Sequence, residues 1–111
     1  MTLQFGDVVL IRMDFHQTAG SKVRPAVVLL DTGDEDFVAA PITSQVRNSN
    51  WDLQIEQWRK AGLNVASYTR AHKLAVLAKA DIARRLGSLA SEDRVRLNSL
   101  ICEALCHRAK R

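Results

Sequence analysis

Short runs of apolar and β-branched residues, separated by polar loops, make up the first half of the chain. The runs lie at residues 7–13, 23–30 and 37–40. Each is typical of a strand, because β-branched side chains pack well on a pleated surface. The polar segments between them contain Gly20 and Gly33, which favour turns. The hydrophobic pattern therefore predicts three strands joined by loops before residue 50.

The middle of the chain predicts shorter and more mixed elements. A short helix is predicted at residues 56–61, ended by Gly62 in the left-handed conformation. Residues 79–86 fit either a helix or a turn that leads into a strand. Many short strands without repeated strand–helix alternation favour a small barrel over a parallel sheet. The further strand candidates are residues 51–55, 65–70 and 73–77.

A final helix is predicted over residues 92–107. Ser91 is the expected N-cap, and the two acidic residues after it lie where the helix dipole favours negative charge. Cys102 and Cys106 share one helix face and are expected to be small, core-facing thiols. The other residues expected to face the core are Val95, Leu97, Leu100, Ile101, Ala104 and Leu105.

Length and composition limit the architecture to one domain over residues 1–111. Hydrophobic residues make up 47% and charged residues 25%, which is ordinary for a globular protein. Neither a membrane-length apolar run nor a secretory signal is recognisable, so we expect a cytoplasmic protein with no membrane contact. The net charge of +4 divides into −2 over residues 1–67 and +6 over 68–111. The basic half suits a polyanionic partner such as nucleic acid, or an acidic protein.

Several catalytic classes find no support in the sequence. The chain has no phosphate-binding Gly-rich loop, dinucleotide fingerprint or nucleophile elbow. Neither His16 nor His72 has a second histidine or cysteine at zinc spacing nearby, and the acidic run at 34–36 suits a solvated turn. We therefore expect neither a metal site nor a bound cofactor.

The segments around Arg24 and Thr43 indicate phosphate chemistry instead. Arg24 lies at the edge of a Val-rich strand, where Pro25 fixes the chain direction, and residues 41–45 form a polar cluster at the exit of the next strand. A guanidinium and a hydroxyl at neighbouring strand ends can bind a phosphate, because one supplies a planar charged fork and the other a donor. The alternative is an ordinary solvated or salt-bridged arginine.

At these residues the chain resembles the PemK/MazF family of toxin endoribonucleases from bacterial toxin–antitoxin modules. The resemblance implies a mainly β (α+β) fold, a Src-homology-3-like small β-barrel of the PemK/MazF/CcdB type with a C-terminal α-helix, usually as a homodimer. It also implies that residues 83–88 form a strand. The matching stretches, in family order, are GDVVL at 6–10, KVRPAVVL at 22–29, APITSQ at 40–45, RRLGSL at 84–89 and SED at 91–93.

The resemblance also implies an activity and a site. Arg24 and Thr43 would be the catalytic pair of a metal-independent, sequence-selective endoribonuclease acting on single-stranded RNA. The ribose 2′-hydroxyl would attack the adjacent phosphorus and leave 2′,3′-cyclic phosphate and 5′-hydroxyl ends. His16 is the candidate acid or base, since imidazole exchanges protons near neutral pH. The expected RNA contacts are Gln17, Thr18, Ser21, Lys22, Ser44, Gln45, Arg47, Arg70 and Lys73.

A toxin of this kind is expected to have a cognate antitoxin with an acidic segment. Two departures from the family pattern are the short lead into the Arg-Pro motif at residues 20–23 and the basic segment at 68–74. Two other functions suit the same fold: a non-catalytic barrel that binds RNA or protein, and a CcdB-like gyrase poison. Against the latter, the chain ends in Ala-Lys-Arg rather than in that family's Trp-Gly-Ile.

Overall fold

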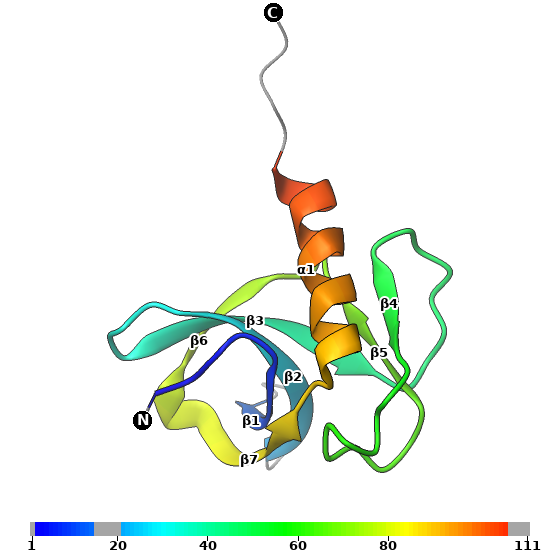
Figure 1. The fold of residues 1–111 in the computed structure, drawn as a ribbon. Coiled ribbons are helices and arrows are strands. Elements are labelled where there is room, and N and C mark those ends of the chain that lie inside the picture. Colours follow the sequence, from blue (N-terminus) through cyan, green and yellow to red (C-terminus); the bar gives the residue numbers. More distant parts are fainter. Residues whose placement is uncertain (1, 15–20, 107–111) are drawn as a thin grey trace, which may run out of the picture.

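The computed structural model describes residues 2–14 and 21–106 of the chain (Figure 1). Its mainly β architecture with a C-terminal helix confirms the expected fold class. Three of the strands coincide closely with the three apolar runs of the first half. The elements are β1 (Asp7–Asp14), β2 (Ser21–Asp31), β3 (Asp36–Thr43), β4 (Asp52–Ile55), β5 (Ser67–Arg70), β6 (Ala75–Ala78), the 3-10 helix η1 (Lys79–Asp81), β7 (Ile82–Ser88) and α1 (Ser91–Leu105).

The strands pair antiparallel in the order β4-β5-β3-β2-β1-β7. β6 also pairs with β3, over residues 36–39 of that strand, and β5 pairs with its last two residues. Within the described part of the chain, β4 and β7 at the two ends of this order do not pair with each other. The hydrogen-bonded path of the sheet is therefore open. The sheet itself curls strongly (Figure 1).

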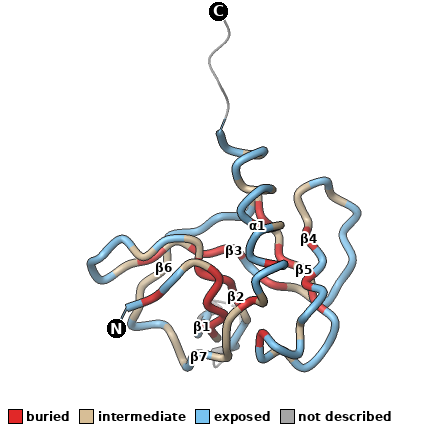
Figure 2. Tube along the Cα trace, viewed as in Figure 1, coloured by how far each residue is buried: buried red, intermediate tan, exposed pale blue. Residues whose placement is uncertain are grey.

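Neighbouring residues of the central strands face two separate apolar cores. Val8 and Val27 belong to one core, which includes Leu97 of α1. Val9 and Val28 belong to the other core. Because both faces of β1 and β2 are buried, their sequences appear as continuous apolar runs rather than as an alternation of apolar and polar residues. Figure 2 shows the buried positions gathered in these central strands.

Helix α1 packs on the sheet through only part of its length. Leu97 is fully buried, and Leu100 and Ile101 pack against the same core. Val95 and Leu105 are exposed, contrary to prediction, with 64% and 52% of their surface accessible. Val95 lies two residues from the buried Asp93 and Leu97 and therefore on the other face of the helix. The last turns, which end at Leu105, extend beyond the sheet and have no surface to cover (Figure 1). The described residues form no helix long and apolar enough to cross a membrane.

Three local predictions are wrong. Cys102 and Cys106 are exposed rather than core-facing, because Cys102 lies near the end of α1 and Cys106 follows it, where the helix projects beyond the sheet (Figure 1). Ala90 is the N-cap residue and gives no side-chain hydrogen bond, while Ser91 is already helical. Residues 56–61 form consecutive turns rather than a helix, although the following glycine does adopt a positive φ of 87°.

The turn between β2 and β3 is organised by the carboxylate of Asp31. The Lys79 ammonium lies 2.7 Å from this carboxylate, and the backbone amides of Leu3 and Gly33 each donate to it at 2.8 Å. The bond to Lys79 and those to the two amides hold the pKa of the Asp31 carboxyl well below its usual range. One side chain thus ties the N-terminal segment, this turn and η1 together.

We expect Asp31 to make the fold sensitive to acid. A carboxyl whose pKa is lowered by folding stabilises the folded state above the unfolded pKa, near 4, and this contribution is lost as the pH falls through the folded value. The free energy of unfolding is measured by urea titration at pH 7, 4 and 3. As the pH is lowered, it should fall less steeply for Asp31→Asn than for the parent chain. Equal slopes for the two proteins would contradict this role. Asp81→Asn, at an exposed carboxylate, is the matched control.

Candidate functional site

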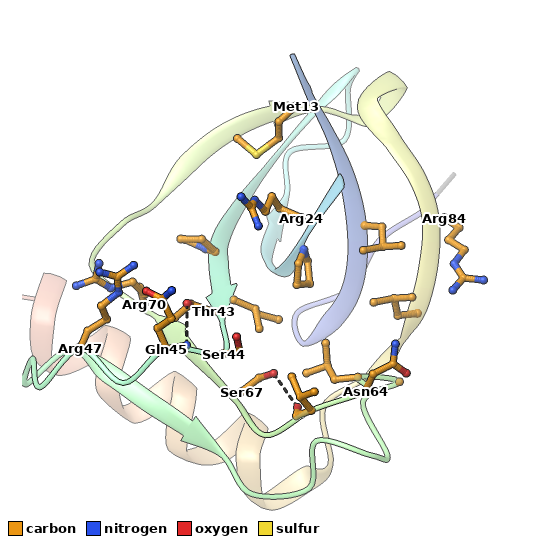
Figure 3. Close-up of a pocket in the computed structure, with 18 residues that line it drawn as sticks. Met13, Arg24, Thr43, Ser44, Gln45, Arg47, Asn64, Ser67, Arg70 and Arg84 are labelled. Carbon is orange, nitrogen blue, oxygen red and sulfur yellow. Dashed lines mark hydrogen bonds between the residues drawn. The ribbon is translucent and has the colours of Figure 1, made fainter. Parts of the chain in front are cut away.

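A pocket of about 700 Å³ opens where the central strands of the sheet end (Figure 3). Strands β1, β2, β3, β5 and β7 contribute to it, together with the loops that follow β3 and β4. Its lining combines apolar side chains with a polar rim. The apolar members are Leu10, Met13, Pro25, Pro41, Ile42, Leu63, Val65 and Leu86, and the others are Arg24, Thr43, Ser44, Gln45, Arg47, Gly62, Asn64, Ser67, Arg70 and Arg84.

The two prolines of the chain explain why the pocket opens at this place. Strand β2 pairs with β3 only as far as Ala26, which lies opposite Pro41. Pro25 comes next on β2, and a proline has no N–H to donate to a ladder. Beyond this point β3 pairs with β5 instead, while β2 keeps its pairing with β1. A gap therefore opens between β2 and β3, and both prolines line it.

Arg24 and Thr43 lie on the two sides of this gap. If the β2–β3 register continued by two residues, Arg24 would stand directly opposite Thr43. The backbone of Arg24 is held by its pairing with Ile11 of β1, and that of Thr43 by its pairing with Tyr68 of β5. Both side chains line the same pocket (Figure 3). The structure thus brings together the two residues that the sequence predicted as a catalytic pair.

The hydrogen bonding of this pair leaves both groups able to act as donors. The hydroxyl oxygen of Thr43 accepts a bond of 3.1 Å from the backbone amide of Gln45, so its proton remains available. Among the described residues, the guanidinium of Arg24 makes no ion pair. A permanent cation and a hydroxyl that face one cavity are a pair of donors suited to a phosphate.

Most of the expected RNA contacts in the described chain line the same pocket. Ser44, Gln45 and Arg47 follow Thr43 in the loop after β3, and Figure 3 shows Gln45, Arg47 and Arg70 on the same side of the pocket as Thr43. Arg70 donates from Nε to Asp52 at 3.0 Å, so its charge is partly compensated. The salt bridge also orients the rest of the guanidinium.

The remaining expected contacts lie elsewhere. Lys73 lines a smaller, apolar cavity of about 170 Å³, which it shares with Arg24. Lys22 is exposed on β2 and lines neither cavity. The structure describes the backbone of Ser21 in β2 but not its side chain. His16, Gln17 and Thr18 lie outside the described residues.

One wall of the pocket is built from the loop between β4 and β5. Asp93 of α1, which is fully buried, accepts hydrogen bonds from the amides of Glu56 and Gln57 at 3.2 and 2.9 Å. Gly62 packs so closely on β7 that a Cβ atom there would lie 2.2 Å from the carbonyl oxygen of Leu86. Helix and sheet together therefore fix the position of this wall.

The sequence did not indicate three polar residues of the pocket. Asn64 lies in the loop after β4, and Ser67 is the first residue of β5. The Ser67 hydroxyl donates to the Val65 carbonyl at 2.9 Å. Arg84 comes from β7. Arg84 lies in the stretch at 84–89 that resembles the family, although its place in the pocket depends on the pairing of β7 with β1. No local signal indicates Asn64 or Ser67. Over residues 2–14 and 21–106, no three His, Cys, Asp or Glu side chains gather as a metal-binding group.

Comparison with known proteins connects this chain to one family. The family described as "PemK-like, MazF-like toxin of type II toxin-antitoxin system" matches residues 4–105 of the chain. No curated protein matches the sequence. The family match covers both sides of the Arg24–Thr43 gap.

Solved structures with the same fold come from the same group of toxins. A MazE-MazF structure from Deinococcus radiodurans has a TM-score of 0.76 at 18% identity, over 96% of this chain and 98% of that one. The Mycobacterium tuberculosis toxin MazF-mt6 has a TM-score of 0.74 at 20% identity, over 93% and 99%. An endoribonuclease in complex with its cognate antitoxin, from a mycobacterial species, has a TM-score of 0.72 at 16% identity, over 98% and 100%. At these identities the likeness establishes the shared fold.

Proposed function

We propose that this chain, which belongs to the PemK-like, MazF-like toxin family of type II toxin–antitoxin systems, is an endoribonuclease that cuts single-stranded RNA. The observation that carries the proposal is the position of Arg24 and Thr43 on the two sides of one gap, both facing the pocket. A phosphodiester in the gap would meet a charged fork and a hydroxyl donor at once. Sequence selectivity would come from the polar rim of the pocket.

The nucleophile in this proposal is the ribose 2′-hydroxyl of the substrate. Its oxygen forms a bond to the adjacent phosphorus, and the bond from phosphorus to the 5′-oxygen of the next nucleotide breaks. The 5′-oxygen keeps the electron pair of the broken bond and takes up a proton from solvent, so the products are a 2′,3′-cyclic phosphate and a 5′-hydroxyl. Attack within one nucleotide is favoured because the reacting atoms are already close together. DNA lacks the hydroxyl and therefore should not be cut.

Arg24 would stabilise the charge that develops on the phosphorane oxygens. Donors fixed in advance at such a position commonly provide the largest single contribution to catalysis. Thr43 would donate to a non-bridging oxygen or orient the attacking hydroxyl. A guanidinium does not readily exchange protons near neutral pH, so His16 is the proposed carrier of the proton that leaves the 2′-oxygen.

The test is an RNA cleavage assay in the presence of a chelator. The purified chain is incubated with a single-stranded RNA and with a DNA of the same sequence, and the new ends are identified. We expect RNA fragments with 2′,3′-cyclic phosphate and 5′-hydroxyl ends, and intact DNA. Cleavage of the DNA, or loss of RNA cleavage in the chelator, would contradict the mechanism. RNA binding without any product would favour the non-catalytic binding barrel instead.

We further infer a cytoplasmic toxin that acts as a homodimer and is neutralised by a cognate antitoxin. Two of the structural relatives are complexes with an antitoxin or with MazE, which supports such a partner here. The charge of +6 over residues 68–111 suits an acidic protein segment. Adding the product of an adjacent short gene to the cleavage assay should abolish RNA cleavage if that product is the antitoxin.

A further inference from the structure

The smaller cavity beside Arg24 lies at the end of the second apolar core. Its volume is about 170 Å³. Along each strand its lining residues are two positions apart, so they belong to one face of the curled sheet. They are Ile11 and Met13 of β1, Arg24 and Ala26 of β2, Ala39 and Pro41 of β3, and Ala75 and Leu77 of β6, with Pro25, Ala40 and Lys73 completing the lining.

Small side chains explain why this end of the core is hollow. Phe37 belongs to the same core, and Leu77 packs against it. Two residues further along the same strands, Ala39 pairs with Ala75, and both line the cavity. A methyl group leaves empty the space that a larger side chain would fill. Because Ala39 is buried and Ala75 is exposed, the cavity extends from the core to the protein surface.

Two cations stand at this otherwise apolar cavity. Among the described residues that line it, only Arg24 and Lys73 are charged. Both are exposed, and neither makes an ion pair within the described part of the chain. Met13 and Arg24 line both this cavity and the larger pocket, as do Pro25 and Pro41. A group in the smaller cavity would therefore lie directly beside a phosphate held by Arg24.

The size and chemistry of the cavity select its occupant. Pockets for drug-sized ligands have about 300–1,000 Å³, so this one suits a single ring system. Apolar walls with cations beside them suit a flat group that is joined to an anion. A nucleobase is such a group, because its faces are apolar and the ribose connects it to a phosphate. In single-stranded RNA the base can leave its neighbours and enter a pocket of this kind.

We infer that the smaller cavity binds the base of a nucleotide next to the scissile phosphate, while Lys73 contacts a flanking phosphate. This inference rests on the proposed ribonuclease function. It gives a role to Lys73, which does not line the larger pocket. It also means that the base is held by shape and apolar contact more than by hydrogen bonds, because the lining offers few polar side chains.

The first arm of the test removes the base from the RNA. The substrate is a single-stranded RNA that the parent chain cuts at one mapped position. Two further versions each lack one base, on the 5′ or the 3′ side of the break, and keep the ribose with its 2′-hydroxyl. Because base contacts of this kind are usually worth a factor of ten or more, we expect kcat/KM to fall roughly tenfold for one of the two abasic RNAs.

The second arm fills the cavity. Ala75→Phe places a ring where the base would lie, so it should lower kcat/KM for the intact RNA by a similar factor. It should then cut the intact and the abasic RNA at nearly the same rate, because the two changes remove one and the same contact. Ala75→Val fills the cavity in part and should fall between the parent and Ala75→Phe. Urea unfolding checks that each variant is folded.

Val76→Phe is the matched control for Ala75→Phe. Val76 is the next residue of β6, is 68% exposed and lines neither cavity, so this variant adds a ring to the other face of the strand. It should keep the preference of the parent chain for the intact RNA over the abasic one.

The outcomes separate this inference from the function on which it rests. If the parent chain cuts RNA but loses no rate with either abasic version, the cavity holds no base and the inference is wrong. It is also wrong if folded Ala75→Phe and Ala75→Val both keep the full preference of the parent for the intact RNA. An apolar side chain of a protein partner would then be the occupant to test. If the parent chain cuts no RNA, the proposed function fails first.

Discussion

Replacing Arg24 by alanine is expected to lower kcat for RNA cleavage by roughly 10²- to 10³-fold, the usual cost of removing a donor that stabilises transition-state charge. The side chain is exposed and makes no ion pair among the described residues. Its removal should therefore change the free energy of unfolding by no more than about 0.5 kcal/mol. Single-turnover cleavage and urea unfolding of the same preparation measure the two quantities.

Two further variants make this prediction specific. Arg24→Lys keeps the charge but loses the planar fork, so it should fall between the parent chain and Arg24→Ala. Arg59→Ala removes an exposed arginine that does not line the pocket and should cleave like the parent. If Arg24→Ala cleaves as fast as Arg59→Ala, the gap between β2 and β3 is not the catalytic centre.

The hydroxyl of Thr43 should contribute less than the guanidinium. Thr43→Val removes the donor and keeps the shape, and Thr43→Ser keeps the donor. Because a neutral hydrogen bond is worth about 1 kcal/mol, Thr43→Val should lower the cleavage rate by roughly tenfold while Thr43→Ser stays near the parent. The reverse order would mean that the methyl group, rather than the hydroxyl, matters at this position.

Asp93→Ala is expected to give the largest loss of stability, about 3 kcal/mol in the free energy of unfolding. The carboxylate is fully buried and accepts from the amides of Glu56 and Gln57, and from Arg96 at 2.8 Å. Without it, two backbone amides lose their partners at a cost of about 1–3 kcal/mol each. Urea unfolding at neutral pH measures the change.

Glu92→Ala is the matched control for Asp93→Ala. Glu92 lies in the same first turn of α1 and feels the same helix dipole, but it is exposed. Its removal should cost less than about 1 kcal/mol. Because Asp93 holds the loop that forms one wall of the pocket, Asp93→Ala should also slow RNA cleavage. Equal losses of stability in the two variants would show that the dipole, and not the buried carboxylate, stabilises this end of the helix.

Local pattern was enough to predict the strands of the first half, whereas the residues of the gap were identified through the family resemblance. β1, β2 and β3 are recognisable because burial on both faces makes their sequences continuously apolar. Arg24 and Thr43 are recognisable because the stretches at 22–29 and 40–45 that contain them resemble the PemK/MazF family. The errors at the end of α1 have a different origin: a 3.6-residue period shows which side chains share a face, but not how much of the helix has a sheet beneath it.

The sequence by itself determined the order of strands and loops, the family, and the two short segments that carry the proposed catalytic pair, since these depend on neighbours along the chain. Only the tertiary structure decided what surrounds that pair. The pairing of β1 with β7 brings Arg84 to the pocket, and the pairing of β4 with β5 brings Asp52 to Arg70. Such contacts join residues far apart in sequence, because the register between strands is set by packing of the whole sheet.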